Sequence, residues 1–204
     1  MTHHRRRNNG IDPSKINETV ELSPAQRYAA FKQTQAKQRT VAAEFARSMP
    51  FELDEFQMQA NDALEAGDNV LVAAPTGAGK TVAADFAIYL AQTRNVKAFY
   101  TTPIKALSNQ KYHDLVDQYG TDKVGLLTGD TSINSEADIV VMTTEVLRNM
   151  LYEHSVTLEA LRYVILDEVH YLADRFRGPV WEEVIIHLPK NVNIIGLSAT
   201  VSNV

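Results

Sequence analysis

Six short apolar segments that alternate with helix-forming segments constrain the fold of this chain more than any other feature. The apolar segments lie near residues 70–74, 98–102, 124–127, 138–143, 162–167 and 193–198. The helical segments lie near residues 79–92, 104–119, 144–153 and 179–188. Continuous apolar strands are buried on both faces, and this alternation is typical of a parallel sheet with helices on both faces. We therefore expect an α/β domain whose ligands bind beyond the carboxyl ends of the strands.

The residues before the first strand predict helices. Ser23 and Pro24 suit the cap and the first turn of a helix that we expect to span residues 23–49. A second helix is expected over residues 54–66. The predicted organisation is a basic, disordered arm over residues 1–22, a helical lead-in over 23–49, and an α/β domain over 50–204.

Composition excludes several classes of protein. A chain of 204 residues with 45% apolar content can bury the core of one globular domain. Cysteine is absent, so a disulfide framework or a thiolate metal site cannot form. The apolar runs are too short for a secretory signal or a membrane span. We therefore expect a cytoplasmic protein with no membrane partner.

Charge is distributed unevenly along the chain. The formal net charge is −5, but residues 1–47 hold nine Lys and Arg against four Asp and Glu. The remaining residues hold eleven against twenty-one, so a basic arm precedes an acidic domain. The run Arg5, Arg6 and Arg7 either contacts nucleic acid or is simply solvated, because three arginines are fewer than a typical binding run.

A glycine-containing loop joins the first strand to the next helix in the segment NVLVAAPTGAGKTVAADFAIYL. It matches the pattern G-x-x-x-x-G-K-[ST] except at Ala74. Glycines let the backbone curl so that its N–H groups face phosphates, the lysine can reach the β- and γ-phosphates, and the threonine hydroxyl can bind Mg²⁺. We count Lys80 as a catalytic residue as well. The expected nucleotide-binding residues are Ala74, Pro75, Thr76, Gly77, Ala78, Gly79, Lys80 and Thr81.

The segment VILDEVHYL carries two carboxylates at the carboxyl end of a buried strand. Asp167 or Glu168 alone could merely cap the following helix. Beside a phosphate loop, Asp167 is expected to hold Mg²⁺, directly or through water, and Glu168 to accept a proton from the attacking water. A positioned base of this kind contributes roughly 10²–10⁴-fold to a rate. His170 either transmits the nucleotide state by hydrogen bonding or is a packed, satisfied histidine.

Seven segments occur in order between residues 50 and 204. They are FELDEFQ, AAPTGAGKT, TTPIKALSNQKY, GLLTGD, MTTEVLRNML, LDEVHYLADRFRGPVWEE and LSATVSN. Together they resemble the first RecA-like domain of the superfamily-two DExH-box helicases, here with the letters DEVH. Within these, the chain is most similar to the superkiller and exosome-cofactor class of RNA helicases, including their actinobacterial relatives.

The resemblance implies a RecA-like P-loop NTPase fold, and ATP and Mg²⁺ as cofactors. It implies an ATP-dependent helicase that moves 3′-to-5′ on single-stranded nucleic acid, with RNA favoured over DNA. A DNA helicase of the same superfamily stays open, because phosphate contacts do not distinguish the sugars. A non-catalytic module that holds a nucleotide or a partner is the other alternative.

The resemblance also assigns roles around the nucleotide. It places Phe51 against the face of the adenine ring, although without the resemblance Phe51 would be interpreted as a core residue. It also implies that Gln57 forms hydrogen bonds with the edge of the adenine ring, which favours ATP over GTP. Ser198 and Thr200 are expected to couple the acidic segment to the nucleic-acid edge. Without the resemblance these two hydroxyls would indicate an ordinary turn at the end of a strand.

A second set of residues is assigned to the nucleic acid. Thr102 is expected to cap a helix and Pro103 to be its first residue, so that the positive end of the helix faces a phosphate. Gly129 is expected to contribute a backbone contact. The Thr144 hydroxyl, the amides that follow it and Arg148 are expected to hold the next phosphate.

Proteins of this class continue into a second RecA-like domain that carries an arginine finger, and that domain is an expected partner in the same parent chain. We therefore expect this chain to be an N-terminal fragment. Loss of an arginine finger lowers phosphoryl transfer by roughly 10³–10⁵-fold. The chain alone is expected to bind ATP weakly and to hydrolyse it very slowly.

Overall fold

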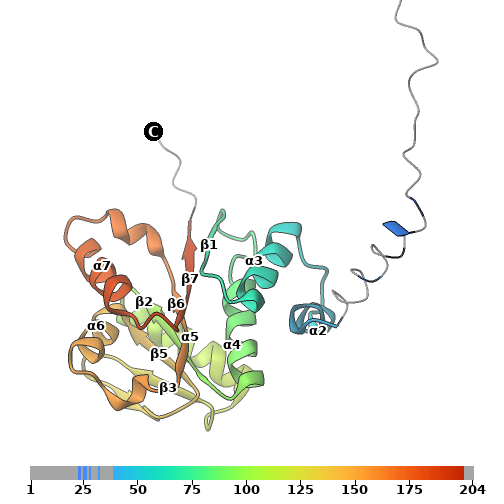
Figure 1. The fold of residues 1–204 in the computed structure, drawn as a ribbon. Helices are drawn as coiled ribbons and strands as arrows, with labels where there is room; N and C mark the ends of the chain where they lie inside the picture. The colour runs from blue at the N-terminus through green and yellow to red at the C-terminus, as the bar shows by residue number, and fades with distance from the viewer. Residues whose placement is uncertain (1–22, 24, 27, 29–31, 33–38, 200–204) are drawn as a thin grey trace, which may run out of the picture. The chain divides into compact units, whose positions relative to one another are not determined.

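A computed structural model describes residues 23, 25, 26, 28, 32 and 39–199 of the chain (Figure 1). The chain divides into two units, residues 1–39 and residues 40–204. In the first unit, the Ser23 amide donates to Gln26 Oε1 at 2.8 Å and the Gln26 amide donates to Ser23 Oγ at 3.3 Å. This reciprocal pair is a capping box, which agrees with a helix that starts at Ser23. The basic arm over residues 1–22 lies outside the described residues.

The single helix expected over residues 23–49 is wrong, because it is interrupted at residues 39 and 40. The second unit begins there with α2, Val41–Ser48. Thr40 has an extended backbone and its side chain accepts a hydrogen bond from the Ala43 amide. A β-branched hydroxyl residue is a better N-cap than a helix-interior residue, so the chain restarts a helix at this point.

The second unit contains one seven-stranded sheet in the order β1-β7-β6-β2-β5-β3-β4. Its strands are β1 Val70–Ala73, β2 Lys97–Thr102, β3 Val124–Leu127, β4 Ser132–Ile133, β5 Ile139–Thr143, β6 Leu161–Leu166 and β7 Asn193–Ser198. All neighbours pair in parallel except β4, which pairs antiparallel with β3. The expected parallel sheet is confirmed, with β4 as an addition. Because β4 has two exposed residues, no apolar run marks it in the sequence.

Helices cover both faces of the sheet, as the sequence predicts (Figure 1). Side chains of α2, α3, α4 and α5 form one core with the sheet, and side chains of α6 and α7 form the other. The further bounds are α3 Glu55–Ala66, α4 Val82–Arg94, α5 Lys105–Tyr119, α6 Thr144–Tyr152 and α7 Gly178–His187, with short 3₁₀ turns η2 Val156–Leu158 and η3 Val169–Ala173. Among the described helices, none combines the length and apolarity that crossing a bilayer requires.

Successive residues of the central strands serve the two cores in turn. On β2, Phe99 packs in the α6 and α7 core, and Tyr100 packs in the α4 and α5 core. On β6, Val164 packs in the α6 and α7 core and Ile165 packs in the α4 and α5 core. Side chains of a strand alternate between faces, so a strand covered on both sides is apolar throughout. This is why the central strands are continuous apolar runs in the sequence.

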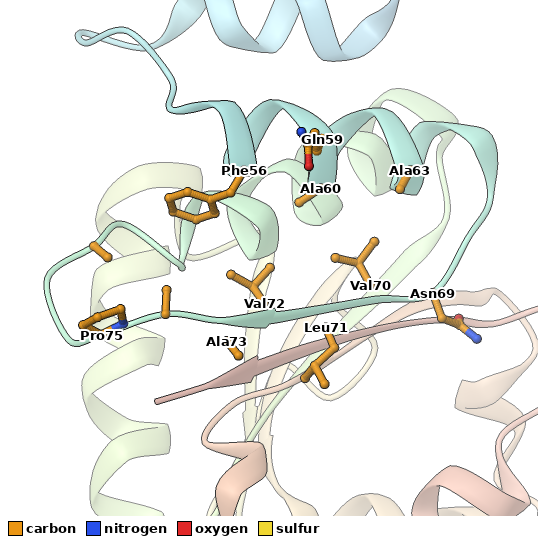
Figure 2. Close-up of a pocket in the computed structure, with 12 residues that line it drawn as sticks. Phe56, Gln59, Ala60, Ala63, Asn69, Val70, Leu71, Val72, Ala73 and Pro75 are labelled. Atoms are coloured by element: carbon orange, nitrogen blue, oxygen red, sulfur yellow. The ribbon is translucent and has the colours of Figure 1, made fainter. Parts of the chain in front are cut away.

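The outer edge of β1 borders an apolar groove of about 650 Å³ (Figure 2). Phe56 and Gln59 of α3 line one side of it, and β1 with Leu71 lines the other. Leu71 is 65% exposed, as expected for a strand at the edge of a sheet. The lining includes Ala74, Pro75 and Ala78 of the glycine loop, but not Lys80, Thr81 or Asp167. The groove is therefore a feature of the sheet edge.

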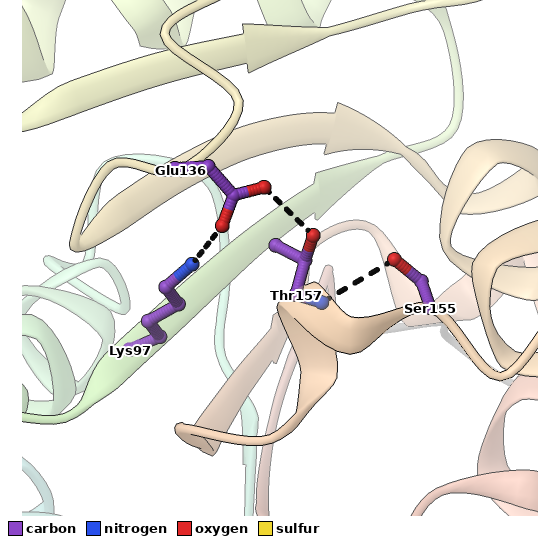
Figure 3. Close-up of polar contacts among 4 residues, drawn as sticks. All are labelled: Lys97, Glu136, Ser155 and Thr157. Atoms are coloured by element: carbon purple, nitrogen blue, oxygen red, sulfur yellow. Dashed lines mark hydrogen bonds and ion pairs between the residues drawn. The ribbon is translucent and has the colours of Figure 1, made fainter.

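Polar contacts tie loops together at the amino end of the sheet (Figure 3). Glu136 accepts from Lys97 Nζ, at the start of β2, and from the Thr157 hydroxyl, both at 2.9 Å. The Thr157 amide lies 3.4 Å from Ser155 Oγ, which caps η2. The two donors lower the pKa of the Glu136 carboxyl, so it stays ionised at neutral pH. This end of the sheet has a structural role, opposite the edge where the candidate site lies.

Candidate nucleotide and nucleic-acid sites

The glycine loop leaves β1 after Ala73 and enters α4 at Val82. The Ala74 amide donates to the Ser198 carbonyl at 3.2 Å, which fixes the start of the loop against β7. Gly77 and Gly79 have φ angles of 87° and 74°, a region that glycine enters without steric cost. Ala74 is not among the residues with positive φ, so its methyl group fits where the motif usually has glycine. Departure from the motif at this position therefore imposes no backbone strain.

Gln57 joins α3 to the glycine loop. Its side chain is buried, Nε2 donates to the Gly79 carbonyl at 3.0 Å, and Oε1 accepts from the Asp54 amide at 2.9 Å. A Cβ atom on Gly79 would lie 2.5 Å from Gln57 Nε2, so a larger residue here would displace the Gln57 amide. One Nε2 proton and one Oε1 lone pair of Gln57 remain for other hydrogen bonds. The expected contact of Gln57 with the edge of the adenine ring stays a prediction. Phe51 is 50% exposed, so its interpretation as a core residue is wrong.

Thr81 stands at the N-cap of α4, where it is exposed and makes no side-chain capping bond. Its hydroxyl is therefore available to a ligand at the positive end of a 13-residue helix. Lys80 precedes it and is half-buried. The amides of Gly77, Gly79, Lys80 and Thr81 donate to no carbonyl of another described residue. The loop thus offers free donors, a hydroxyl and an ammonium group, which is the donor set that a triphosphate requires.

The carboxylate of Asp167 is held on both oxygens directly after β6. Oδ1 accepts from the Glu168 amide at 2.9 Å, and Oδ2 accepts from the Tyr100 hydroxyl at 2.8 Å. Burial, and then the charge of Asp167, raise the pKa of Tyr100 well above its ordinary value, so the phenol keeps its proton and donates. Glu168 has a left-handed backbone with φ of 56° and makes no side-chain capping bond, which disfavours the reading as a mere helix cap.

His170 lies beside Glu168. Its Nδ1 is 3.1 Å from Glu168 Oε2, although the orientation is not that of a hydrogen bond. The side chains are 32% and 29% exposed, so this histidine is not part of a closed core. The contact becomes an ion pair when the imidazole is protonated. A role for His170 in transmitting the nucleotide state stays a prediction.

The sheet brings the glycine loop and the acidic pair to the same edge. β7 lies between β1 and β6, and Ser198 at its end pairs with Ala73. The ends of β1 and β6 are two strand spacings apart, roughly 10 Å. A triphosphate with its metal can span that distance from Lys80 to Asp167. Thr200 lies outside the described residues, so only Ser198 of the expected coupling pair can be placed.

The oxygen ligands present suit Mg²⁺. Thr81 supplies a hydroxyl and Asp167 a carboxylate, and Mg²⁺ in phosphate-transfer sites is held by one or two carboxylates together with waters and substrate phosphates. Within residues 39–199 and the few described before them, no group of three or more His, Cys, Asp and Glu could hold a metal. This sparse set fits a metal that arrives with a nucleotide.

The start of α5 differs from the expectation. Thr102 was expected to cap this helix and Pro103 to open it, but Ile104 is the N-cap and α5 begins at Lys105. The reason is the sheet, because Thr102 still pairs with Thr143 in the β2–β5 ladder. Thr102 Oγ1 donates to the Ile104 carbonyl at 3.0 Å, and Thr102 and Pro103 are both buried. They position the helix start and do not present side chains at the surface.

Thr144 opens α6 as expected, but its hydroxyl is buried and donates to the Thr102 carbonyl at 3.2 Å. The hydroxyl therefore has a partner inside the chain, and its expected contact with a phosphate stays a prediction. It ties the end of β5 to the end of β2, and the backbone amides of the first turn remain as donors. Arg148 is 30% exposed, and its Nε lies 3.7 Å from Glu183 Oε2 on α7.

The turn after β3 approaches the start of α5. Asp130 forms an ion pair with Lys105, the first residue of α5, and this partner lowers the pKa of the carboxyl. Gly129 is exposed, with open space where a side chain would be. Because β2, β5 and β3 are neighbours, the loops that follow them form one edge beside the nucleotide half of the sheet. Lys105 is an exposed cation on this edge that the sequence analysis missed.

Comparison with known proteins decides between the unrelated families that use a glycine loop. Residues 54–204 match the model of the family described as DEAD/DEAH box helicase. The chain belongs to the DEAD/DEAH box helicase family. The resemblance in the seven ordered segments is confirmed, as is the RecA-like fold.

Several proteins named as helicases share long stretches with this chain. The probable helicase HelY of Mycobacterium tuberculosis (strain ATCC 25618 / H37Rv) is 63% identical over 159 residues, which cover 78% of this chain and 18% of HelY. The antiviral helicase SKI2 of Saccharomyces cerevisiae is 54% identical over 158 residues, which cover 78% of this chain and 12% of SKI2. This chain therefore spans less than a fifth of either relative.

A solved helicase structure shares the fold. The helicase Lhr of Mycobacterium smegmatis, bound to single-stranded DNA and AMP-PNP, matches with a TM-score of 0.57 and 32% identity. The match covers 72% of this chain and 23% of that chain. Similarity to HelY and to SKI2 agrees with the superkiller class that the seven segments indicated.

Tyr100 holds the acidic motif of this helicase domain, and the sequence analysis assigned no role to this residue. Tyr100 reads as one more apolar residue of a buried strand, yet its hydroxyl reaches Asp167. The available signal was the phenol itself, because a buried tyrosine hydroxyl normally has a hydrogen-bond partner. The identity of that partner could not be read from the sequence, since 67 positions separate the two residues.

Proposed function

We propose that this chain is the ATP-binding domain of an ATP-dependent RNA helicase that couples hydrolysis to 3′-to-5′ movement and unwinding. One observation carries the proposal: the glycine loop after β1 and the acidic pair after β6 lie at one edge of the sheet, with only β7 between them. The loops after β2, β5 and β3 continue that edge. Nucleotide and nucleic acid can therefore bind side by side on one rigid sheet.

The side chains divide the chemistry between them. Lys80 and the loop amides would hold the β- and γ-phosphates, and Thr81 and Asp167 would hold Mg²⁺. The metal, when bound, neutralises negative charge on the transferred phosphoryl group. Glu168 would take a proton from the attacking water, because its carboxylate is partly exposed and no capping bond occupies it.

Contacts to nucleic acid would use backbone amides more than net charge. The buried Thr102 and Thr144 hydroxyls fix the starts of α5 and α6, so that first-turn amides and Lys105 face the edge. Phosphate contacts of this kind position a strand without reading its bases. An acidic domain can bind RNA in this way.

RNA is proposed over DNA because the chain resembles the superkiller class of RNA helicases. A DNA helicase remains the second candidate, since the Lhr structure contains single-stranded DNA. The parent protein should bind a single-stranded RNA more tightly than a DNA of the same sequence if a 2′-hydroxyl is contacted. Equal affinities at matched salt concentration would favour the DNA reading.

The deciding experiment substitutes Glu168→Gln in the parent protein. We expect nucleotide binding to remain and RNA-stimulated ATP hydrolysis to fall by roughly 10²–10⁴-fold. Glu182→Gln, an exposed residue of α7, is the matched control and should keep full activity. Unchanged hydrolysis in the Glu168 variant would mean that another part of the parent protein hydrolyses ATP. This chain would then be a non-catalytic nucleotide-binding module.

The chain alone is proposed to bind ATP weakly and to turn it over slowly, because the arginine finger belongs to the second RecA-like domain. Its absence costs roughly 10³–10⁵-fold in phosphoryl transfer. Hydrolysis by these 204 residues should therefore stay near the background measured without protein. Robust RNA-stimulated turnover by the chain alone would refute this part of the proposal.

A further inference from the structure

A polar group lies beneath the acidic motif and takes no direct part in the proposed chemistry. Tyr100 of β2 is 1% exposed, and its hydroxyl donates to Asp167 Oδ2 at 2.8 Å. Lys111 of α5 places Nζ 5.2 Å from the centroid of the Tyr100 ring. Asp85 of α4, a helix on the same face of the sheet, interacts electrostatically with Lys111. Tyr100 thus connects the Asp167 carboxylate, through a hydrogen bond, to Lys111 of α5, through a ring contact.

We propose that Tyr100 is a positioning residue for Asp167 and that Lys111 links this position to α5. The inference rests on the proposed function, because it assumes that Asp167 serves the metal. Tyr100 would act through the carboxylate alone and would touch neither nucleotide nor metal.

The geometry at Asp167 supports a positioning role. A carboxylate on a single-bonded side chain can rotate, but here the Glu168 amide holds Oδ1 and the Tyr100 hydroxyl holds Oδ2. Each oxygen keeps a lone pair for a metal or a metal-bound water. Partners of this kind orient metal ligands, and their removal typically lowers metal affinity roughly 10–100-fold. Tyr100 is well suited to the task because a fully buried ring on a central strand cannot move aside.

Lys111 extends the contact to a helix that borders the nucleic-acid edge. Its side chain is 22% exposed and also lies 3.8 Å from Asp114 Oδ2. A partly desolvated ammonium group over an aromatic face is attracted to the ring. Lys111 belongs to the same helix as Lys105, and Tyr100 precedes Thr102 by two residues on β2. A shift of α5 would therefore move Lys111 relative to the ring that holds Asp167.

The test uses Tyr100→Phe in this chain and a fluorescent, non-hydrolysable ATP analogue. Affinity is measured once with EDTA and once with Mg²⁺, and Mn²⁺ binding in the presence of the analogue is followed by electron paramagnetic resonance. We expect the affinity in EDTA to be unchanged. The gain in affinity from Mg²⁺, and the affinity for Mn²⁺, should fall by roughly 10–100-fold. Lys111→Gln should give the same change with a smaller amplitude.

Tyr163→Phe is the matched control. Tyr163 is also 1% exposed, on the adjacent strand β6, but its hydroxyl pairs with Arg94 at the other end of the strand. It should leave the Mg²⁺-dependent gain unchanged. Thermal unfolding of each variant checks that the fold persists.

Two results would overturn the inference alone. One is a Tyr100→Phe variant with the full Mg²⁺-dependent gain of the unsubstituted chain. The other is an equal loss of affinity with EDTA and with Mg²⁺, which would mean that the hydroxyl serves folding only. If the unsubstituted chain binds no nucleotide under either condition, the proposed function itself fails and the inference fails with it.

Discussion

Substitution of Asp85 by asparagine should change the stability of this domain in a strongly pH-dependent way. Asp85 lies on α4, where burial raises the pKa of its carboxyl from 3.8 to about 6, and the charge of Lys111 opposes part of that rise. The shift of about two units corresponds to about 3 kcal/mol, at 1.36 kcal/mol per unit. This is the upper limit of what an ionised Asp85 costs the folded state.

The direction of the effect follows from the raised pKa. The folded state prefers the protonated carboxyl, so ionisation destabilises it. The cost is absent below about pH 4, grows between pH 4 and 6, and is complete above pH 6. The other groups that face Asp85 are Lys111, Tyr100 and Tyr119. Burial raises the pKa of Tyr119 to about 12 and the pKa of Tyr100 well above its ordinary value, so neither phenol titrates between pH 4 and 7.5.

Asp85→Asn removes the charge at every pH. We therefore expect the variant to be more stable than the unsubstituted chain by up to about 3 kcal/mol at pH 7.5 and equally stable near pH 4. The assay is urea unfolding of both proteins at several pH values, followed by circular dichroism. The carboxyls with lowered pKa, such as Asp130 and Glu136, lose their stabilising effect as the pH falls, but they do so equally in both proteins.

Asp114→Asn is the matched control, because Asp114 also faces Lys111 but its side chain is 57% exposed. It should change stability little at any pH, as exposed ion pairs do. A stability difference for Asp85→Asn that is constant from pH 4 to pH 7.5 would refute the reasoning. A variant that is less stable at pH 7.5 would also refute it. In that case the attraction between Lys111 and the ionised Asp85 would exceed the cost of burying the charged carboxylate.

Two further predictions concern residues that the fold constrains closely. Gly79→Ala places a Cβ atom against Gln57 in a left-handed backbone. We expect this to lower the free energy of unfolding by about 1–3 kcal/mol and to weaken binding of the fluorescent ATP analogue. Undiminished affinity would show that the loop adapts freely. The buried Asn61 amide has no hydrogen-bond partner among the described residues. Asn61→Leu should therefore raise the free energy of unfolding, measured in urea, by about 1–3 kcal/mol. A loss of stability would mean that the amide has a hydrogen-bond partner.

The candidate site could be predicted in outline because its motifs are local. The strand, glycine loop and helix around Lys80 are consecutive in the chain, and the pair Asp167 and Glu168 ends a strand marked by its own apolar run. Their meeting follows from a general rule, since parallel strands present their carboxyl ends at one edge. The roles of Gln57 and Thr144 were harder to predict, because the structure gives their polar atoms partners inside the chain.

Helix boundaries show where local signals were insufficient. Thr102 and Pro103 look like the start of a helix, but the ladder between β2 and β5 keeps Thr102 extended and delays α5 to Lys105. The interruption at Thr40 was missed for a related reason, because helical periodicity on both sides concealed a capping residue. In each case a specific hydrogen bond outweighed a propensity of a few tenths of a kcal/mol per residue.

The sequence by itself determined the alternating sheet architecture, the order of the motifs and the ends of strands at which they lie. These properties depend on neighbours in the chain, and periodicity records them directly. Only the tertiary structure decided which distant side chains support the motifs, as with Tyr100 beneath Asp167, 67 positions away. The physical reason is that a buried polar group must find a partner, while the strand order of the folded sheet decides which partner is within reach.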